Sequence, residues 1–230
     1  MKPNGGIRLG YQASENWRFS FRNSYMLIGG SDNPQNEKNN NVRGTSFERN
    51  LSFRTTIMDA ALIAEYNLTR FKLKSSFVPS IFAGANVYYS NPRARVAGDG
   101  EWYDLRAVGT GGQTLYNGDY ILDRDGSTRL AYKKIMYGIP YGASVKRHLT
   151  QKVILTLSYT YNKIFTDYLD AVGTDLYPDS ELIKYVNPDL GPVAVSLANP
   201  GNQPNTAQRS YSDNNDGYGY WGFTFTFKIY

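Results

Sequence analysis

The chain has 230 residues, a formal net charge of +5 and no cysteine, which excludes a disulfide framework, a thiolate metal site and a cysteine nucleophile. Its longest apolar runs, such as AALIA at Ala60 to Ala64, are far shorter than the ~20 residues of a membrane-spanning helix, so a helical membrane protein is excluded. A closed barrel of strands is then the way in which this chain can cross a membrane, because a barrel pairs its backbone groups without a long hydrophobic stretch.

The first predicted strands show an alternation of apolar and polar side chains. A short strand from Ile7 to Gln12 is followed by a longer strand from Trp17 to Leu27. Successive side chains of a strand point to opposite faces, so one face of the longer strand is apolar and the other carries Arg18 and Arg22.

Two further strands are predicted from Leu51 to Leu68 and from Phe77 to Tyr89. The first of them changes phase near Ile57, where a β-bulge is expected to bring the following apolar residues onto the apolar face. These residues are Met58, Ala60, Leu62, Ala64 and Tyr66. Asp59 and Glu65 are then the candidate acids of the polar face.

Three more strands complete the series, from Ile135 to Lys146, from Val153 to Lys163 and from Trp221 to Ile229. Each of them repeats the period of two. A water-soluble β-sandwich has the same alternation with its apolar face turned inward, so the strands alone leave both architectures open.

The connections between the predicted strands alternate in length. Short polar turns occupy residues 13–16, 69–76 and 150–152, whereas long loops rich in Gly, Asn, Asp and Pro occupy about 29–50, 90–133 and 165–216. Short turns at one rim and long loops at the other are typical of an outer-membrane barrel, with the turns in the periplasm. We therefore predict that residues 1–230 form one all-β domain, an eight-stranded antiparallel up-and-down transmembrane β-barrel of the bacterial outer membrane.

The polar face of these strands is predicted to line the lumen. A barrel of about eight strands is narrow enough for side chains to fill its interior. Arg18, Arg22 and Lys146 are expected to form a network with polar partners there. The seven visible strands are an odd number, whereas single-chain bacterial barrels have an even one, so we expect one further strand and an export signal upstream.

Five segments of the chain together resemble a known family. They are NLSFRTTIMDAALIAEYN (Asn50 to Asn67), PSIFAGANVYYSNPRA (Pro79 to Ala94), WYDLRAVGTGGQ (Trp102 to Gln113), GIPYGASVK (Gly138 to Lys146) and KIFTDYLDAVGTDLYPD (Lys163 to Asp179). In this order they are similar to the PorG-type outer-membrane β-barrel proteins of the type IX secretion system. The WYDL…GTGGQ and FTDYLD segments are the specific part of the resemblance, since the strands would match many barrels.

The resemblance implies a non-enzymatic component of a secretion machine. It implies an eight-stranded barrel that links the outer membrane to the periplasmic ring built from the lipoprotein PorK and its partner PorN. Composition and spacing indicate only a membrane barrel with one elaborate rim.

The two specific segments are candidates for loop packing or partner binding. FTDYLD follows a strand and interleaves aromatic with acidic side chains, which suits a loop that packs on itself or folds over the barrel mouth. The resemblance favours a role shared with the WYDL segment, in which the two loops lock together. The candidate residues are Trp102, Tyr103, Asp104, Gly109, Gln113, Phe165, Thr166, Asp167, Tyr168 and Asp170.

Three other patterns are weaker signs of chemistry. Ser144 and His148 can share a face, but a Ser–His pair also needs an orienting carboxylate and an oxyanion donor, so we interpret His148 as a structural or solvated turn residue. DRDGST, with Asp123 and Asp125, lacks the glutamate of an EF-hand loop and is interpreted as an exposed acidic turn. GTGGQ lacks the lysine of a phosphate-binding loop, and its glycines are expected to serve positive φ angles.

The expected function is therefore that of a non-enzymatic outer-membrane scaffold without a cofactor. Its expected partners are outer-membrane lipid, PorK and PorN. Nucleic acid is not expected, because the lysines and arginines are scattered rather than gathered in an aromatic and basic groove. The alternative is a surface-exposed adhesin or ligand-binding barrel that uses its long loops.

Overall fold

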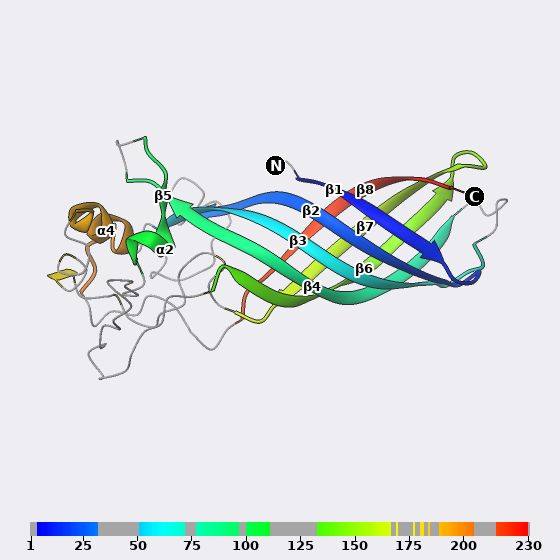
Figure 1. Cartoon of the computed structure of the whole chain (residues 1–230), viewed down its shortest axis with the longest axis horizontal. Coiled ribbons are helices and arrows are strands. Elements are labelled where there is room, and N and C mark those ends of the chain that lie inside the picture. The colour runs from blue at the N-terminus through cyan, green and yellow to red at the C-terminus, as the bar shows by residue number, and fades with distance from the viewer. Residues whose placement is uncertain are drawn as a thin grey trace, which may run out of the picture.

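Seven long strands form one antiparallel sheet in which every strand pairs with its neighbours along the chain (Figure 1). The computed structural model describes residues 4–31, 51–71, 77–96, 100–110, 133–166, 169, 177, 180–181, 184, 189–204 and 215–229. The strands are β1 (Asn4–Gln12), β2 (Trp17–Ser31), β3 (Ser52–Asn67), β4 (Val78–Ala94), β6 (Ile135–His148), β7 (Val153–Ile164) and β8 (Gly217–Phe227). A two-residue strand, β5 (Tyr103–Asp104), pairs with the end of β4. The prediction of an all-β, antiparallel, up-and-down fold is confirmed.

The sheet curls around a lumen and is open between its edge strands, since β1 and β8 do not pair with each other in the part of the chain that the structure describes. β1 and β8 run in the same direction (Figure 1). A direct pair between them would be parallel, whereas one strand placed between them would be antiparallel to both. The predicted upstream strand would occupy this position, and it stays a prediction.

The outward face of the sheet is apolar. On β8 this face presents Trp221, Phe223, Phe225 and Phe227, and on β7 it presents Leu157. The exposed fraction is 74% for the Phe223 side chain and 39% for Leu157. A β-sandwich would bury such residues between two sheets, so that architecture is excluded.

β3 runs without a bulge. Its register is continuous with β2 and with β4 from Arg54 to Tyr66. The predicted phase change near Ile57 is therefore wrong, because Ile57 is buried on the lumen face while Arg54 and Thr56 already lie outward with Met58. What changes along β3 is the polarity of the outward face, which is polar at Ser52, Arg54 and Thr56 and apolar from Met58 onward, so the side-chain pattern resembles a change of phase.

Two strands extend further than predicted. β2 continues to Ser31 and β4 to Ala94, so both enter segments that were predicted to be loops. Pro92 lies inside the extension of β4, beyond Tyr89, where the pairing of β4 with β6 ends. Proline is tolerated at such an edge position because no neighbouring strand needs its missing N–H.

The two ends of the sheet differ sharply. The short connections β1–β2, β3–β4 and β6–β7 lie at one end, which we call the turn rim, and β5 with two helices lies at the other, the loop rim (Figure 1). The helices are α2 (Leu105–Val108) and α4 (Gly191–Ala198), and the sequence did not predict them. Among the described residues, no helix has the length and apolar character needed to cross a membrane.

Candidate functional site

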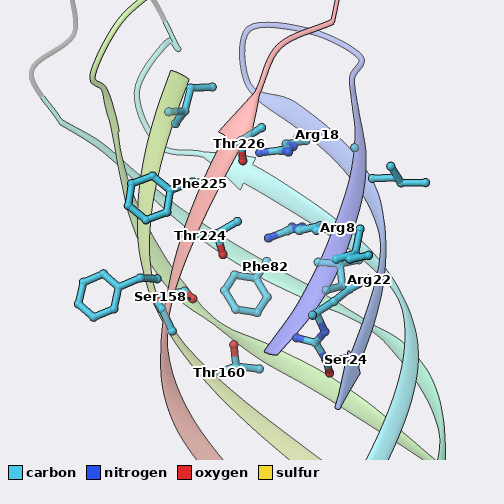
Figure 2. A pocket seen from close by; sticks show the side chains of 18 of the residues that line it. Arg8, Arg18, Arg22, Ser24, Phe82, Ser158, Thr160, Thr224, Phe225 and Thr226 are labelled. Atoms are coloured by element: carbon cyan, nitrogen blue, oxygen red, sulfur yellow. Dashed lines mark hydrogen bonds between the residues drawn. The ribbon is translucent and has the colours of Figure 1, made fainter. Parts of the chain in front are cut away.

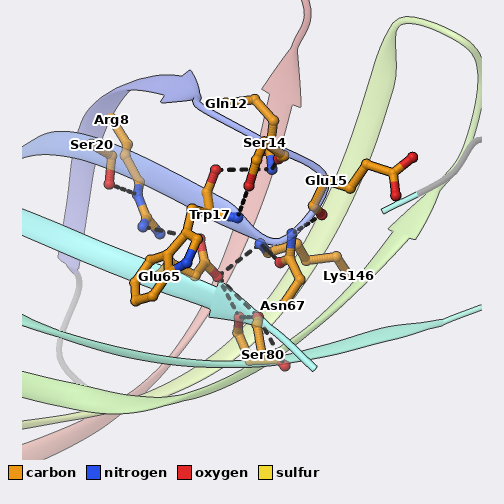
Figure 3. A network of polar contacts seen from close by, with 11 residues as sticks. Arg8, Gln12, Ser14, Glu15, Trp17, Ser20, Glu65, Asn67, Ser80 and Lys146 are labelled. Atoms are coloured by element: carbon orange, nitrogen blue, oxygen red, sulfur yellow. Dashed lines mark hydrogen bonds and ion pairs between the residues drawn. The ribbon is translucent and has the colours of Figure 1, made fainter. Parts of the chain in front are cut away.

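A cage of polar side chains surrounds Glu65 in the lumen near the turn rim (Figure 3). The carboxylate of Glu65, which β3 directs inward, lies 3.0 Å from Lys146 Nζ and 3.3 Å from an Arg8 guanidinium nitrogen. It also accepts hydrogen bonds from the hydroxyls of Ser80 at 3.0 Å and Ser144 at 2.9 Å. The side chains of Glu65 and Lys146 are 0% and 1% exposed, so these four partners supply the compensation that a buried ion pair needs.

The Glu65 cage joins five strands. Arg8 of β1 donates a second hydrogen bond to the hydroxyl of Ser20 of β2 at 2.8 Å. Lys146 of β6 donates a second one to Asn67 Oδ1 of β3 at 2.7 Å. With Ser80 on β4, the cage thus ties β1, β2, β3, β4 and β6 together.

A second cage surrounds Asp59, six residues from Glu65 along β3, or ~20 Å at the rise of a strand. Asp59 accepts hydrogen bonds from Arg22 at 2.8 Å, from Asn86 at 3.2 Å and from the Ser24 hydroxyl. Arg22 also donates to the Tyr220 hydroxyl of β8 at 2.8 Å, so the Asp59 cage reaches the opposite edge of the sheet.

Apolar side chains fill the lumen on either side of the Asp59 cage. Ala61, Ile63 and Phe82 form one cluster between the two acidic residues of β3. A larger cluster lies toward the loop rim, and its buried members are Met26, Ile57, Tyr88, Met136, Ile164 and Leu169. Ionic and apolar layers therefore alternate along the lumen.

Arg18, the third predicted lumen residue, also lies inward and is buried. Gly10 leaves room for the Arg18 guanidinium group. A Cβ added to Gly10 would lie only 2.7 Å from Arg18 Nε. Arg18 and Arg8 face a cavity of about 1000 Å³ between β1 and β8, and Thr224 of β8 faces it from the other side (Figure 2). In the described part of the chain Arg18 forms no ion pair, unlike Arg22 and Lys146, which the structure places in the two cages.

Sequence reasoning placed Asp59 and Glu65 on the polar face but missed several of their partners. Arg8, Ser80 and Asn86 belong to short or less regular predicted strands, whose polar positions were not assigned to a face. The signal was present, since the outward residues Ile7 and Leu9 leave Arg8 on the lumen side.

The Glu65 cage has no free position at which a substrate could react. The Ser144 hydroxyl donates to Glu65, and Lys146 Nζ is bound to the same carboxylate and to Asn67 Oδ1. The ring of His148 stacks on Phe71 with a centroid separation of 4.5 Å, and no hydrogen bond joins His148 to Ser144 within the described ranges. Nor do three metal-ligating side chains gather anywhere among the residues that the structure describes.

At the loop rim, Asp104 organises the helix that follows it. Its carboxylate accepts hydrogen bonds from the backbone N–H groups of Arg106 and Ala107, as an N-cap of α2, and from Lys134 Nζ at 2.8 Å. Partial burial opposes the ionisation of Asp104, but the hydrogen bond from Lys134 and those from the helix N-terminus outweigh it and lower the pKa of the carboxyl below its usual value. Gly109 ends α2 with a left-handed φ of 75°, which is the role expected for this glycine.

The two longest loops meet through α2 and α4. Leu105 and Val108 of α2 form one buried cluster with Ala194 and Leu197 of α4, against Ala94 at the end of β4. The second and third long loops are therefore packed together, as the predicted lock requires, but through residues that the sequence did not single out.

Of the predicted lock residues, Tyr103 packs against this cluster, whereas Trp102 and Phe165 are not among its members. The Trp102 ring forms cation–π contacts with the guanidinium groups of Arg54 and Arg95. Tyr103, whose ring packs against the cluster, donates a hydrogen bond to Glu101 at 3.3 Å. No ring contact joins Trp102 to Phe165 within the described ranges.

Phe165 and Thr166 lie directly after β7. The backbone N–H of Phe165 donates to the carbonyl of Tyr137 at 3.1 Å, and the Thr166 carbonyl accepts from the backbone N–H of Asp216 at 2.9 Å. The remaining predicted positions lie outside the described residues, namely Gln113, Asp123, Asp125, Asp167, Tyr168 and Asp170.

Comparison of the chain with models of known protein families gave no match, and comparison with curated proteins gave none either.

Proposed function

We propose that this chain is a non-enzymatic outer-membrane component of the type IX protein secretion machinery, which anchors the periplasmic PorK/PorN ring at the outer membrane. The observation that carries the membrane part of the proposal is the inverted polarity of the sheet. Phe223 and its aromatic neighbours are exposed on the outside, while Glu65 and Asp59 are buried with their cationic partners on the inside. Hydrocarbon outside and a polar lumen inside would satisfy both faces.

A scaffold suits this interior better than a channel or an enzyme. The Glu65 and Asp59 cages join strands across the lumen and stiffen the wall, and apolar clusters pack beside them. The assignment to type IX secretion is supported by the two specific loop segments, of which the first contains the Asp104-capped helix α2.

Crosslinking in intact cells followed by purification in detergent tests the proposal. We expect PorK and PorN to be recovered, with the crosslinks formed at the turn rim through residues 13–16, 69–76 or 150–152. A matched set of crosslinkable residues at the loop rim is the control, and it should not recover the ring. Ring recovery only from the loop rim would mean that the inside and outside assignments are reversed, and recovery from neither rim would defeat the scaffold.

A surface adhesin or ligand-binding barrel is the second candidate. The observation that favours it is the cluster between α2 and α4, which gives the loop rim an ordered, packed structure. The same crosslinking experiment separates the two candidates, because an adhesin should recover only external ligands, and only through the loops.

A further inference from the structure

Two arginines face each other on the outward surface of the sheet at the loop rim. Arg54 of β3 and Arg93 of β4 are direct partners in the antiparallel register, and both side chains point outward and are exposed. Like charges directly opposite on neighbouring strands are destabilising. Two arginines in this arrangement do not stabilise the sheet, which indicates that they serve another purpose, such as binding an anion.

A third arginine is brought to the same place by Trp102. The guanidinium carbons of Arg54 and Arg95 each lie 5.6 Å from the centroid of the Trp102 ring. Cation–π contact with one ring orients two guanidinium groups that would otherwise move independently. We call Arg54, Arg93, Arg95 and Trp102 the rim arginine patch.

The two carboxylates in the described segment from Glu101 to Asp104 have partners other than these arginines. Asp104 binds Lys134 at 2.8 Å and caps α2, and Glu101 accepts a hydrogen bond from the Tyr103 hydroxyl. Among the described residues, no ion pair reaches any of the three arginines of the rim arginine patch. Within the described segments, the positive charge of the patch is therefore not balanced by an ion pair, which suits an anion from outside the chain.

The position of the patch indicates the source of that anion. Along β3, the outward apolar residues begin at Met58, four residues or ~13 Å from Arg54 toward the turn rim. On β4 the outward Tyr89 lies equally far from Arg93. Positive charge just beyond an apolar band, with aromatic rings at the border, lies at the depth of lipid headgroups.

We propose that the rim arginine patch binds the phosphate of an outer-leaflet lipid headgroup. Guanidinium groups donate paired hydrogen bonds to phosphate oxygens, and here Trp102 holds Arg54 and Arg95 while the strand register places Arg93 directly opposite Arg54. The inference rests on the outer-membrane location of the proposed function and adds to it a specific lipid contact.

Native mass spectrometry of the full chain in detergent micelles tests the inference, with lipid A and dephosphorylated lipid A as probes. We expect the wild-type chain to retain the phosphorylated lipid roughly tenfold better, since charge-assisted hydrogen bonds of this kind are worth about one decade in affinity. The triple variant Arg54→Gln, Arg93→Gln, Arg95→Gln should lose the preference.

Arg147→Gln is the matched control. Arg147 also points outward from a strand and also stacks on an aromatic ring, that of Phe77, but at the turn rim. It should keep the full preference for phosphorylated lipid. An equal loss in Arg147→Gln, or an unchanged preference in the triple variant, would overturn the site.

Two further measurements keep the outcome clear. Arg93→Gln alone removes the like-charge pair, so it should weaken the lipid preference while leaving the free energy of unfolding unchanged or higher. Competition by inorganic phosphate as strong as that by lipid A would overturn the lipid assignment in favour of a soluble anion. Failure of PorK and PorN to crosslink would defeat the proposed function and would leave the lipid preference standing, so the two failures are distinguishable.

Discussion

Glu65 shows at the scale of single residues how a charged lumen can be stable. It is fully buried, yet it has two cationic partners and two hydroxyl donors. The cage stabilises the fold only while all its partners are present. A buried charge that loses one partner still has its desolvation penalty, and less interaction energy to offset it.

Replacement of Lys146 by Met should therefore be strongly destabilising. We expect the free energy of unfolding, measured by urea titration in detergent micelles, to fall by about 3–5 kcal/mol, because Glu65 stays charged and buried beside a vacated position. The double variant Glu65→Gln with Lys146→Met should recover much of this loss. A change within about 1 kcal/mol is expected for Glu15→Gln, which breaks an exposed ion pair with Arg70 at the turn rim. Equal losses of unfolding free energy in the Lys146 and Glu15 variants would show that the buried cage stabilises the fold no more than an exposed ion pair does.

Asp104 gives a pH-dependent prediction. Its pKa is lowered in the folded chain, so its stabilising effect on α2 is complete above the unfolded pKa of about 3.9 and is lost as the pH falls through the lower folded pKa. Amide hydrogen exchange at Leu105 to Gly109 should therefore accelerate on acidification below about pH 4, once corrected for intrinsic rates. Asp104→Asn should remove this pH dependence, whereas Glu101→Gln, three residues earlier, should retain it.

At the scale of elements, the contact between α2 and α4 is the feature that joins two loops far apart in the sequence. Leu105 and Leu197 are both buried in it. α2 is only four residues long, so tertiary packing and its Asp104 cap must stabilise it, since isolated helices of this length do not form.

A double-mutant cycle on this contact should be non-additive. Leu105→Ala and Leu197→Ala are each expected to cost about 2–5 kcal/mol of local stability, measured by hydrogen exchange of the loop amides. Each removes the same packing, so the double variant should lose less than the sum. The predicted Trp102–Phe165 lock is tested by the same cycle with Trp102→Ala and Phe165→Ala. We expect those losses to add, because Trp102 stacks on arginines rather than on Phe165.

The elements that were predictable from the sequence are those governed by a period of two. All seven long strands follow from it, because an apolar outer face repeats at every second residue whatever the length of the strand. The helices α2 and α4 were missed since four and eight residues in a segment rich in Gly and Asn carry too little periodicity. The wrong bulge at Ile57 and the missed lumen position of Arg8 have the same cause. The polarity of a few neighbouring residues does not show which face of a strand a residue is on, whereas its position in the continuous register does.

At the scale of the whole molecule, the lumen is layered, with a cavity of about 1000 Å³ between β1 and β8. Two ionic cages and two apolar clusters alternate along it. We therefore expect no large steady channels when the protein is inserted in planar lipid bilayers, with an open porin in the same bilayer system as the positive control. Sustained high conductance would show that the cages do not block the lumen.

The order of the strands has a consequence for assembly. Each hydrogen-bonded pair in the sheet consists of strands that are consecutive along the chain, apart from the inserted β5, and two of these pairs, β1–β2 and β6–β7, are tight hairpins at the turn rim. Hairpins can therefore form early, and neighbouring hairpins can then pair with each other, because all these contacts join strands that are close in sequence. The long external connections enter the rate only through a closure entropy that grows with the logarithm of their length, so evolution can enlarge the exposed surface of such a protein at little kinetic cost.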